Sequence, residues 1–178
     1  EELLMPLLMS LPHSASEINV TMGYPMKSTP VAGFTEALLR LQQNSRKAGE
    51  GTVSFYYKDV QTILLHPYME RGEAPQGNRL LEEISEMNLI RVEQERFGSD
   101  FEKLIFRQVD GTENLISYLR EIYLRMLDFI AEDERKLFPE LHREFILRIL
   151  IQLNRLETLL CANPEIPMAV FGRLFRKV

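Results

Sequence analysis

The residue types that most often carry chemistry are sparse in this sequence and are not grouped. The three histidines, His13, His66 and His142, stand far apart, and none has another histidine at the spacing of a metal-binding motif. Cys161 is the single cysteine, so the chain can build neither an internal disulfide nor a zinc site of the multi-cysteine kind. We therefore expect no metal site and no other cofactor.

Acidic and glycine-rich segments do not supply a catalytic set either. The runs Glu82–Glu83 and Glu132–Glu134 have no nucleophile motif beside them, and exposed helix ends explain them. The segment Gly49–Gly51 is not a phosphate-binding loop, because it lacks the Lys and the Ser or Thr that end such loops. We expect that the chain by itself is not an enzyme.

Basic residues gather in two places. Three stand near the C-terminal end of a helix predicted over 30–44: Arg40, Arg46 and Lys47. Three more lie near one face of an amphipathic segment predicted over 168–178: Arg173, Arg176 and Lys177. Cations at a helix C-terminus complement the helix dipole, which explains the first group. Phosphate contact is the alternative for that group, and it stays open.

The composition describes one globular domain or two small ones. The chain has 178 residues, of which 45% are hydrophobic and 26% charged, enough to bury a core. Its formal charge is 21 − 26 = −5, so any contact with nucleic acid must be local. No apolar run reaches the roughly 18 residues of a membrane span, and no leader pattern begins the chain. We expect a cytoplasmic protein without membrane contact.

Local patterns divide most of the chain into short elements. Helical spacing of apolar residues predicts these helices: 3–11, 30–44, 56–66, 78–87 and 100–106. Thr29 and Pro30 are the expected N-cap and first-turn residues of the second helix. Strands are predicted over 18–22 and 89–92, and loops over 45–52 and 70–77.

Two long apolar stripes give the strongest structural signal. Apolar residues recur at every third or fourth position over 115–129 and again over 146–160. These stripes predict helices over 113–131 and 139–162, about 28 and 36 Å long at ~1.5 Å per residue. Helices of such lengths with a short connection pack as an antiparallel pair. The expected fold is mainly α: an irregular helical domain with a long antiparallel helix pair and one or two short strands.

Two segments of the sequence resemble a known protein family. The first is INVTMGYPMKSTP at 18–30, and the second is FYYKDVQTILLHPY at 55–68. Together they resemble AddB-like subunits of bacterial helicase-nucleases, in particular the Bacteroidetes-type proteins that end in a PD-(D/E)XK nuclease domain. The match covers about residues 1–68, and Met26 stands where a Leu is more usual in the family. Beyond residue 68 only the helical pattern agrees.

The resemblance implies a position within a longer parent protein, in agreement with the missing initiator Met. Residues 1–30 would form the edge of the second RecA-like motor domain, and residues 31–178 a helical 2B-like accessory domain with an internal loop at 70–77. The ATP-binding loop would lie upstream and the nuclease carboxylates downstream. The implied partners are the rest of the parent chain, DNA and an AddA-like helicase subunit, in a DNA-repair exonuclease.

The leading hypothesis is therefore a noncatalytic accessory domain that positions DNA and neighbouring domains. DNA contact should be weak and local, and its candidate residues are Lys27, Arg173, Arg176 and Lys177, which would face the motor domain. The negative charge favours an alternative, a helical protein-interaction module without a nucleic-acid role. A third reading, a small metal-dependent enzyme, lacks a site.

Overall fold

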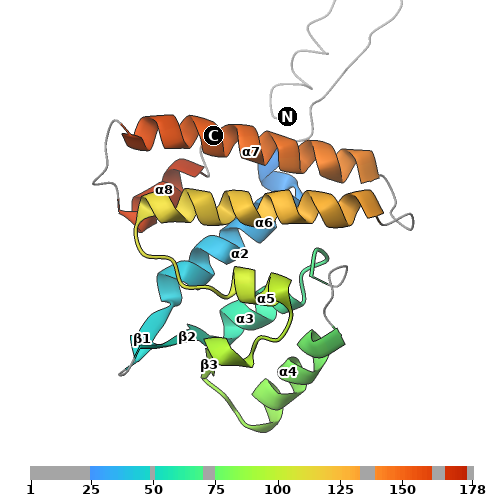
Figure 1. Ribbon diagram of the computed structural model, residues 1–178, viewed down its shortest axis with the longest axis vertical. Helices are drawn as coiled ribbons and strands as arrows, with labels where there is room; N and C mark the ends of the chain where they lie inside the picture. Colours follow the sequence, from blue (N-terminus) through green and yellow to red (C-terminus); the bar gives the residue numbers. More distant parts are fainter. Residues whose placement is uncertain (1–24, 49–50, 70–74, 133–138, 162–166, 176–178) are drawn as a thin grey trace, which may run out of the picture.

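The structure is a computed structural model that describes residues 25–48, 51–69, 75–132, 139–161 and 167–175 (Figure 1). Within these residues the chain is mostly helical, with one small antiparallel sheet, so the predicted mainly α fold is confirmed. The elements in chain order are η1 Met26–Ser28, α2 Pro30–Asn44, β1 Arg46–Ala48, β2 Thr52–Tyr56, α3 Tyr57–Leu64, α4 Pro75–Glu86, β3 Arg91–Glu93, η2 Gln94–Arg96, α5 Asp100–Ile105, α6 Thr112–Glu132, α7 Pro139–Cys161 and α8 Met168–Phe175.

Helices α6 and α7 form the predicted antiparallel pair along one side of the molecule (Figure 1). Their apolar stripes are buried against each other and against the rest of the core, with Leu119, Ile122, Ile149 and Leu153 at 0–1% exposure. Both helices begin and end within one residue of the predicted limits. The prediction of a long helix pair is confirmed.

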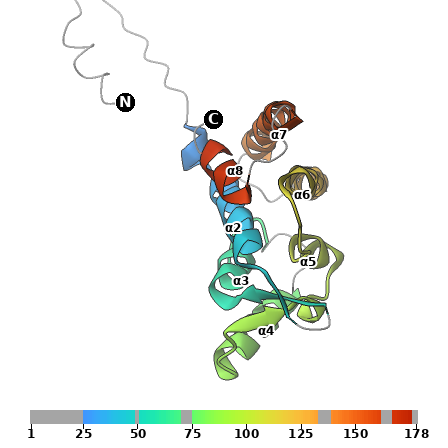
Figure 2. The ribbon, with the colours of Figure 1, turned by 90° about the vertical axis from the view of Figure 1, so that its left-hand side faces the viewer.

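Helix α2 packs beneath this pair and connects it to the remaining elements (Figure 2). The Thr29 side chain caps the helix, because its hydroxyl oxygen accepts a 3.2 Å hydrogen bond from the backbone N–H of Ala32. Farther along, the hydroxyl groups of Thr35 and Tyr123 lie 2.5 Å apart and tie α2 to α6. Helices α3, α7 and α8 also contact α2, which is therefore the central element of the described fold.

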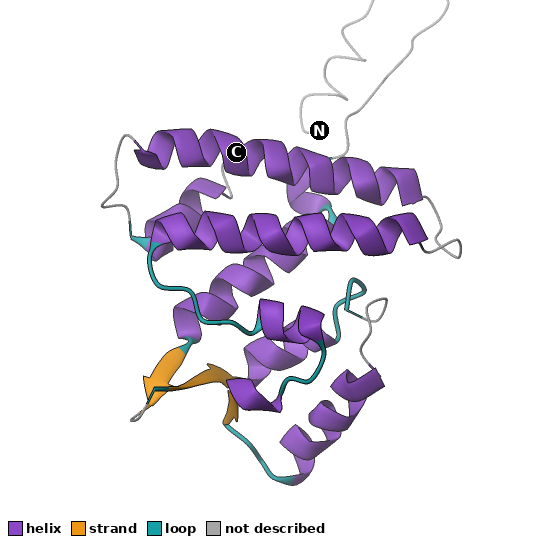
Figure 3. Ribbon diagram, in the orientation of Figure 1, coloured by secondary structure: helices purple, strands orange, loops and turns teal. Residues whose placement is uncertain are grey.

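The sheet corrects one prediction, because residues 45–52 are not simply a loop. β1 and β2 form an antiparallel hairpin, and β3 pairs with the other side of β2 (Figure 3). Gly51 adopts a φ of 96° in the turn, a conformation that glycine tolerates without strain. β2 is buried at Phe55 and gains its second neighbour from β3, which is distant in sequence. This long-range pairing stabilises a hairpin that the local glycine pattern had indicated as a loop.

Other boundaries differ by a few residues. The strand predicted over 89–92 is β3 at Arg91–Glu93, and α4 begins at Pro75, so residues 75–77 of the predicted 70–77 loop are helical. The predicted helix at 3–11 and strand at 18–22 lie outside the described residues, and the domain boundary at residue 30 stays a prediction. No helix in the described ranges is long and apolar enough to cross a membrane.

Candidate nucleic-acid interface

A buried carboxylate joins α2 to the first turn of α3. The Asp59 side chain is 5% exposed, and its Oδ1 lies 3.2 Å from Nε of Arg40. Its Oδ2 accepts a 2.7 Å hydrogen bond from Nδ2 of Asn44. Both carboxylate oxygens therefore have partners, while the Arg40 side chain remains 58% exposed.

Arg91 extends this network across the sheet. Its Nε donates to Oγ of Ser54 at 2.9 Å, and its Nη2 donates to the Ser54 carbonyl oxygen at 2.6 Å. The same Nη2 lies 3.0 Å from the carbonyl oxygen of Asn44, at the end of α2. The guanidinium group thus spans β2 and reaches the C-terminal end of α2, where cations are favoured.

Arg46 brings a further positive charge to the same sheet face. It pairs in register with Ser54, and Ser54 in turn pairs with Glu93, so their side chains share one face. The pKa of Arg91 is lowered, first by burial and then by the positive charge of Arg46, while Asp59 opposes the shift. The two guanidinium groups repel each other, and a bound anion would relieve that repulsion.

We call Arg40, Arg46 and Arg91 the arginine cluster. Arg40 is paired with Asp59 and shares a cleft with Glu36, whereas on the sheet face Arg46 and Arg91 stand beside one acidic residue, the exposed Glu93, so two positive charges face one negative charge there. This local excess of positive charge contrasts with the net charge of −5 for the whole chain. The chemistry that fits the cluster is contact with a phosphate group.

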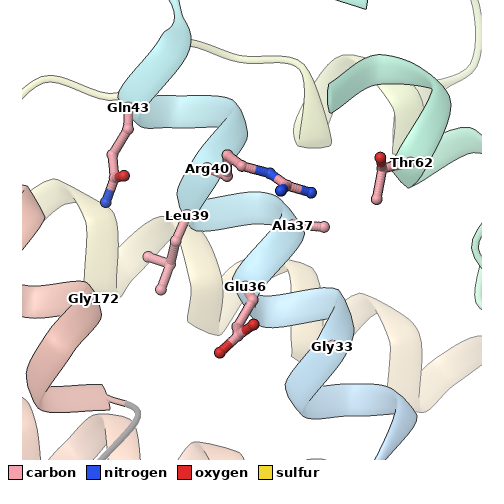
Figure 4. A pocket seen from close by; sticks show the side chains of 8 residues that line it. All are labelled: Gly33, Glu36, Ala37, Leu39, Arg40, Gln43, Thr62 and Gly172. Atoms are coloured by element: carbon pink, nitrogen blue, oxygen red, sulfur yellow. The ribbon is translucent and has the colours of Figure 1, made fainter. Parts of the chain in front are cut away.

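A polar cleft of about 250 Å³ runs beside the cluster along α2. In Figure 4, Arg40 points toward Thr62 of α3, whereas Leu39 and Gln43 lie on the side of α8. A Cβ atom at Gly172 would lie 3.4 Å from Nε2 of Gln43, so α8 approaches α2 closely. The cleft is lined by Gly33, Glu36, Ala37, Leu39, Arg40, Gln43, Thr62 and Gly172.

Two of the predicted DNA contacts, Lys27 and Arg173, are described by the structure and lie outside the arginine cluster. Lys27 is exposed in η1, ahead of the first turn of α2. Arg173 is exposed on α8 and follows Gly172, which packs near Gln43 in the last turn of α2. The structure therefore places Lys27 and Arg173 near opposite ends of α2. Arg176 and Lys177 lie outside the described residues.

The structure also joins two histidines that the sequence leaves far apart. The Tyr68 hydroxyl group lies 3.0 Å from Nδ1 of His142, and the Tyr68 backbone N–H donates to Nδ1 of His66 at 3.3 Å. Burial lowers the pKa of His66 to about 4, against the opposing effect of a hydrogen bond with the backbone of Pro30. No group of three metal-ligating side chains occurs within the described part of the chain.

The sequence did not indicate Arg91 as a functional candidate, and for Arg46 it favoured the helix-dipole explanation with phosphate contact as the open alternative. Neither residue carries a motif, and they share a face only because β1 and β3 both pair with β2. The buried Asp59 had no distinguishing signal in the sequence either.

Comparisons with known protein families, curated proteins and solved structures find no match to this chain.

Proposed function

We propose that the chain is a noncatalytic helical accessory domain of a DNA-repair helicase-nuclease. In this role it positions DNA and contacts the neighbouring domains of its parent protein and an AddA-like helicase subunit in the cytoplasm. The resemblance at 18–30 and 55–68 supports the family. The single structural observation that carries the DNA role is the arginine cluster, with its excess of positive charge on an acidic chain.

The cluster suits weak and local DNA contact. Arginine presents a planar fork of donors that matches phosphate oxygens, and phosphate contacts position a protein on DNA without reading its sequence. Because the remainder of the chain is net acidic, long-range attraction to DNA is small. The affinity of the isolated chain should therefore be low and should fall steeply as salt rises.

Arg46→Gln is the variant that tests this proposal. Arg46 is exposed, whereas Arg91 donates hydrogen bonds to Ser54 and Asn44 that hold the fold. In a titration of dye-labelled duplex DNA at about 50 mM salt, we expect several-fold weaker binding, with the slope of log K against log salt reduced by about 1.

The matched control is Arg155→Gln, which removes the same charge from an exposed position on α7, a helix that lies away from the sheet (Figure 1). This control should bind like the wild type. Equal losses in both variants, or a wild-type chain that binds neither duplex nor single-stranded DNA, would contradict the DNA role.

The second candidate, a protein-interaction module, has one observation in its favour. Leu147 and Ile151 are 41% and 52% exposed on the outward face of α7, although Leu153 on the same helix is fully buried. For this candidate the partner is the remainder of the parent chain. A Leu147→Gln, Ile151→Gln double variant should then lose association with the separately produced remainder, as measured by analytical ultracentrifugation. Unchanged association would exclude this face.

A further inference from the structure

An aromatic ring lies beside the arginine cluster. Tyr56 pairs directly with Arg91 in the sheet register, and its side chain shares a face with Ser54 two residues earlier. Phe55, on the opposite face, is fully buried in the core, but Tyr56 is only half-buried. Tyr56 is therefore partly exposed on the sheet face that also carries Arg46 and Arg91.

The neighbouring residues hold this ring in place. Tyr57 packs against the hydrophobic core, and its ring centroid lies 5.0 Å from that of Tyr56 at an interplanar angle of 73°. This edge-to-face contact favours one relative orientation of the two rings. The exposed Lys58 places its Nζ 5.9 Å from the Tyr57 ring centroid. Arg91 is thus the sheet partner of Tyr56, and Lys58 lies beside Tyr57.

We propose that Tyr56 is a base-stacking platform and that this sheet face, with Arg46 and Arg91 and with Lys58 from the adjoining first turn of α3, binds single-stranded DNA in preference to duplex. The proposal rests on the DNA role proposed above and specifies its substrate.

The preference follows from the chemistry of the two kinds of DNA. Phosphate contacts by arginine and lysine serve either form, so cations alone do not select a single strand. The bases of a duplex are already stacked inside the helix, whereas an unpaired base can lay its face on an aromatic ring. Such stacking tolerates any base sequence, which suits a domain that positions DNA without reading it.

The test uses the 178-residue chain and three dye-labelled probes of equal length, about 12 nucleotides: oligo-thymidine, an abasic single strand and a duplex. By fluorescence anisotropy, the wild type should bind oligo-thymidine about tenfold more tightly than the abasic strand. Tyr56→Leu should remove that difference and leave duplex binding unchanged. Tyr56→Phe keeps the aromatic ring and should bind like the wild type.

The outcomes separate this inference from the proposed function. Equal binding of oligo-thymidine and the abasic strand by the wild type, or tighter binding of duplex, would overturn the stacking platform and leave the DNA role standing. A chain that binds none of the three probes would overturn both. Matching thermal melting of Tyr56→Leu and Tyr56→Phe confirms that a loss of binding is not a loss of fold.

Discussion

His66 illustrates how packing sets the protonation of a single residue. Its ring centroid lies 4.8 Å from that of Phe34 and 5.2 Å from that of Tyr68. Its Nδ1 accepts the backbone N–H of Tyr68, so that nitrogen acts as an acceptor in the folded chain. Burial lowers the pKa of the imidazole from 6.5 to about 4. The side chain is thus neutral at physiological pH and serves as part of an aromatic cluster.

This lowered pKa predicts a loss of stability in mild acid. Below about pH 6.5 the unfolded chain binds a proton at His66 that the folded chain does not bind until about pH 4. The free energy of unfolding should therefore decrease as the pH falls through this window. Above the window His66 is neutral in both the folded and the unfolded chain, and its burial then carries no protonation penalty. Melting temperatures measured from about pH 7.5 to about pH 5 should show the decrease.

The control variants separate His66 from other titrating groups. His66→Gln removes the titration and should flatten the dependence of melting temperature on pH. His142→Gln leaves His66 in place and should keep the wild-type dependence. Identical curves for His66→Gln and the wild type would show that other groups cause the loss.

At the scale of elements, the sequence best predicted the helices whose apolar residues repeat with the helical period. The stripes of α6 and α7 predicted the ends of both helices to within one residue, because each stripe is long enough to show that period. The β1–β2 hairpin was missed, because its strands are short and β2 depends on pairing with the distant β3. The candidate site also depends on the pairing of β2 with β3, because Arg91 reaches Ser54 and Asn44 only once that pairing exists.

The buried stripe of α7 predicts a clear contrast between neighbouring positions. Leu153 is fully buried, so Leu153→Ala should leave a cavity and lower the free energy of unfolding by about 2–5 kcal/mol. Ile151→Ala, two residues away at 52% exposure, should cost about 0.5 kcal/mol or less. Urea denaturation followed by circular dichroism measures both. Similar losses in the two variants would mean that the buried face of α7 is assigned wrongly.

At the scale of the whole molecule, charge limits how DNA can be held. The chain carries 26 acidic against 21 basic residues. Several exposed cations of the described residues are already paired with acids, as in Lys47 with Asp110 at 2.5 Å and Arg107 with Glu121 at 2.9 Å. Paired cations contribute less to phosphate binding, because their charge is already compensated. DNA contact must therefore come from a few local groups.

The number of such groups can be read from salt dependence. Each phosphate contact on a single strand contributes roughly −0.7 to the slope of log K against log salt. Arg46, Arg91 and Lys58 alone would give a slope of about −2. If the residues expected from the sequence, Lys27, Arg173, Arg176 and Lys177, also contact DNA, the slope should approach about −5 on an oligonucleotide long enough to reach them.

We expect the steeper slope for the wild type and about −2 for a variant with those four residues changed to Gln. Titrations from about 50 to about 200 mM salt measure this slope. The probe is a strand of about 30 nucleotides, which is long enough to bridge both ends of α2. A slope of about −2 in both proteins would remove the four residues from the interface and leave the sheet face as the contact. Tight binding that does not respond to salt would contradict the electrostatic argument itself, because a net acidic chain then holds DNA by forces other than phosphate contact.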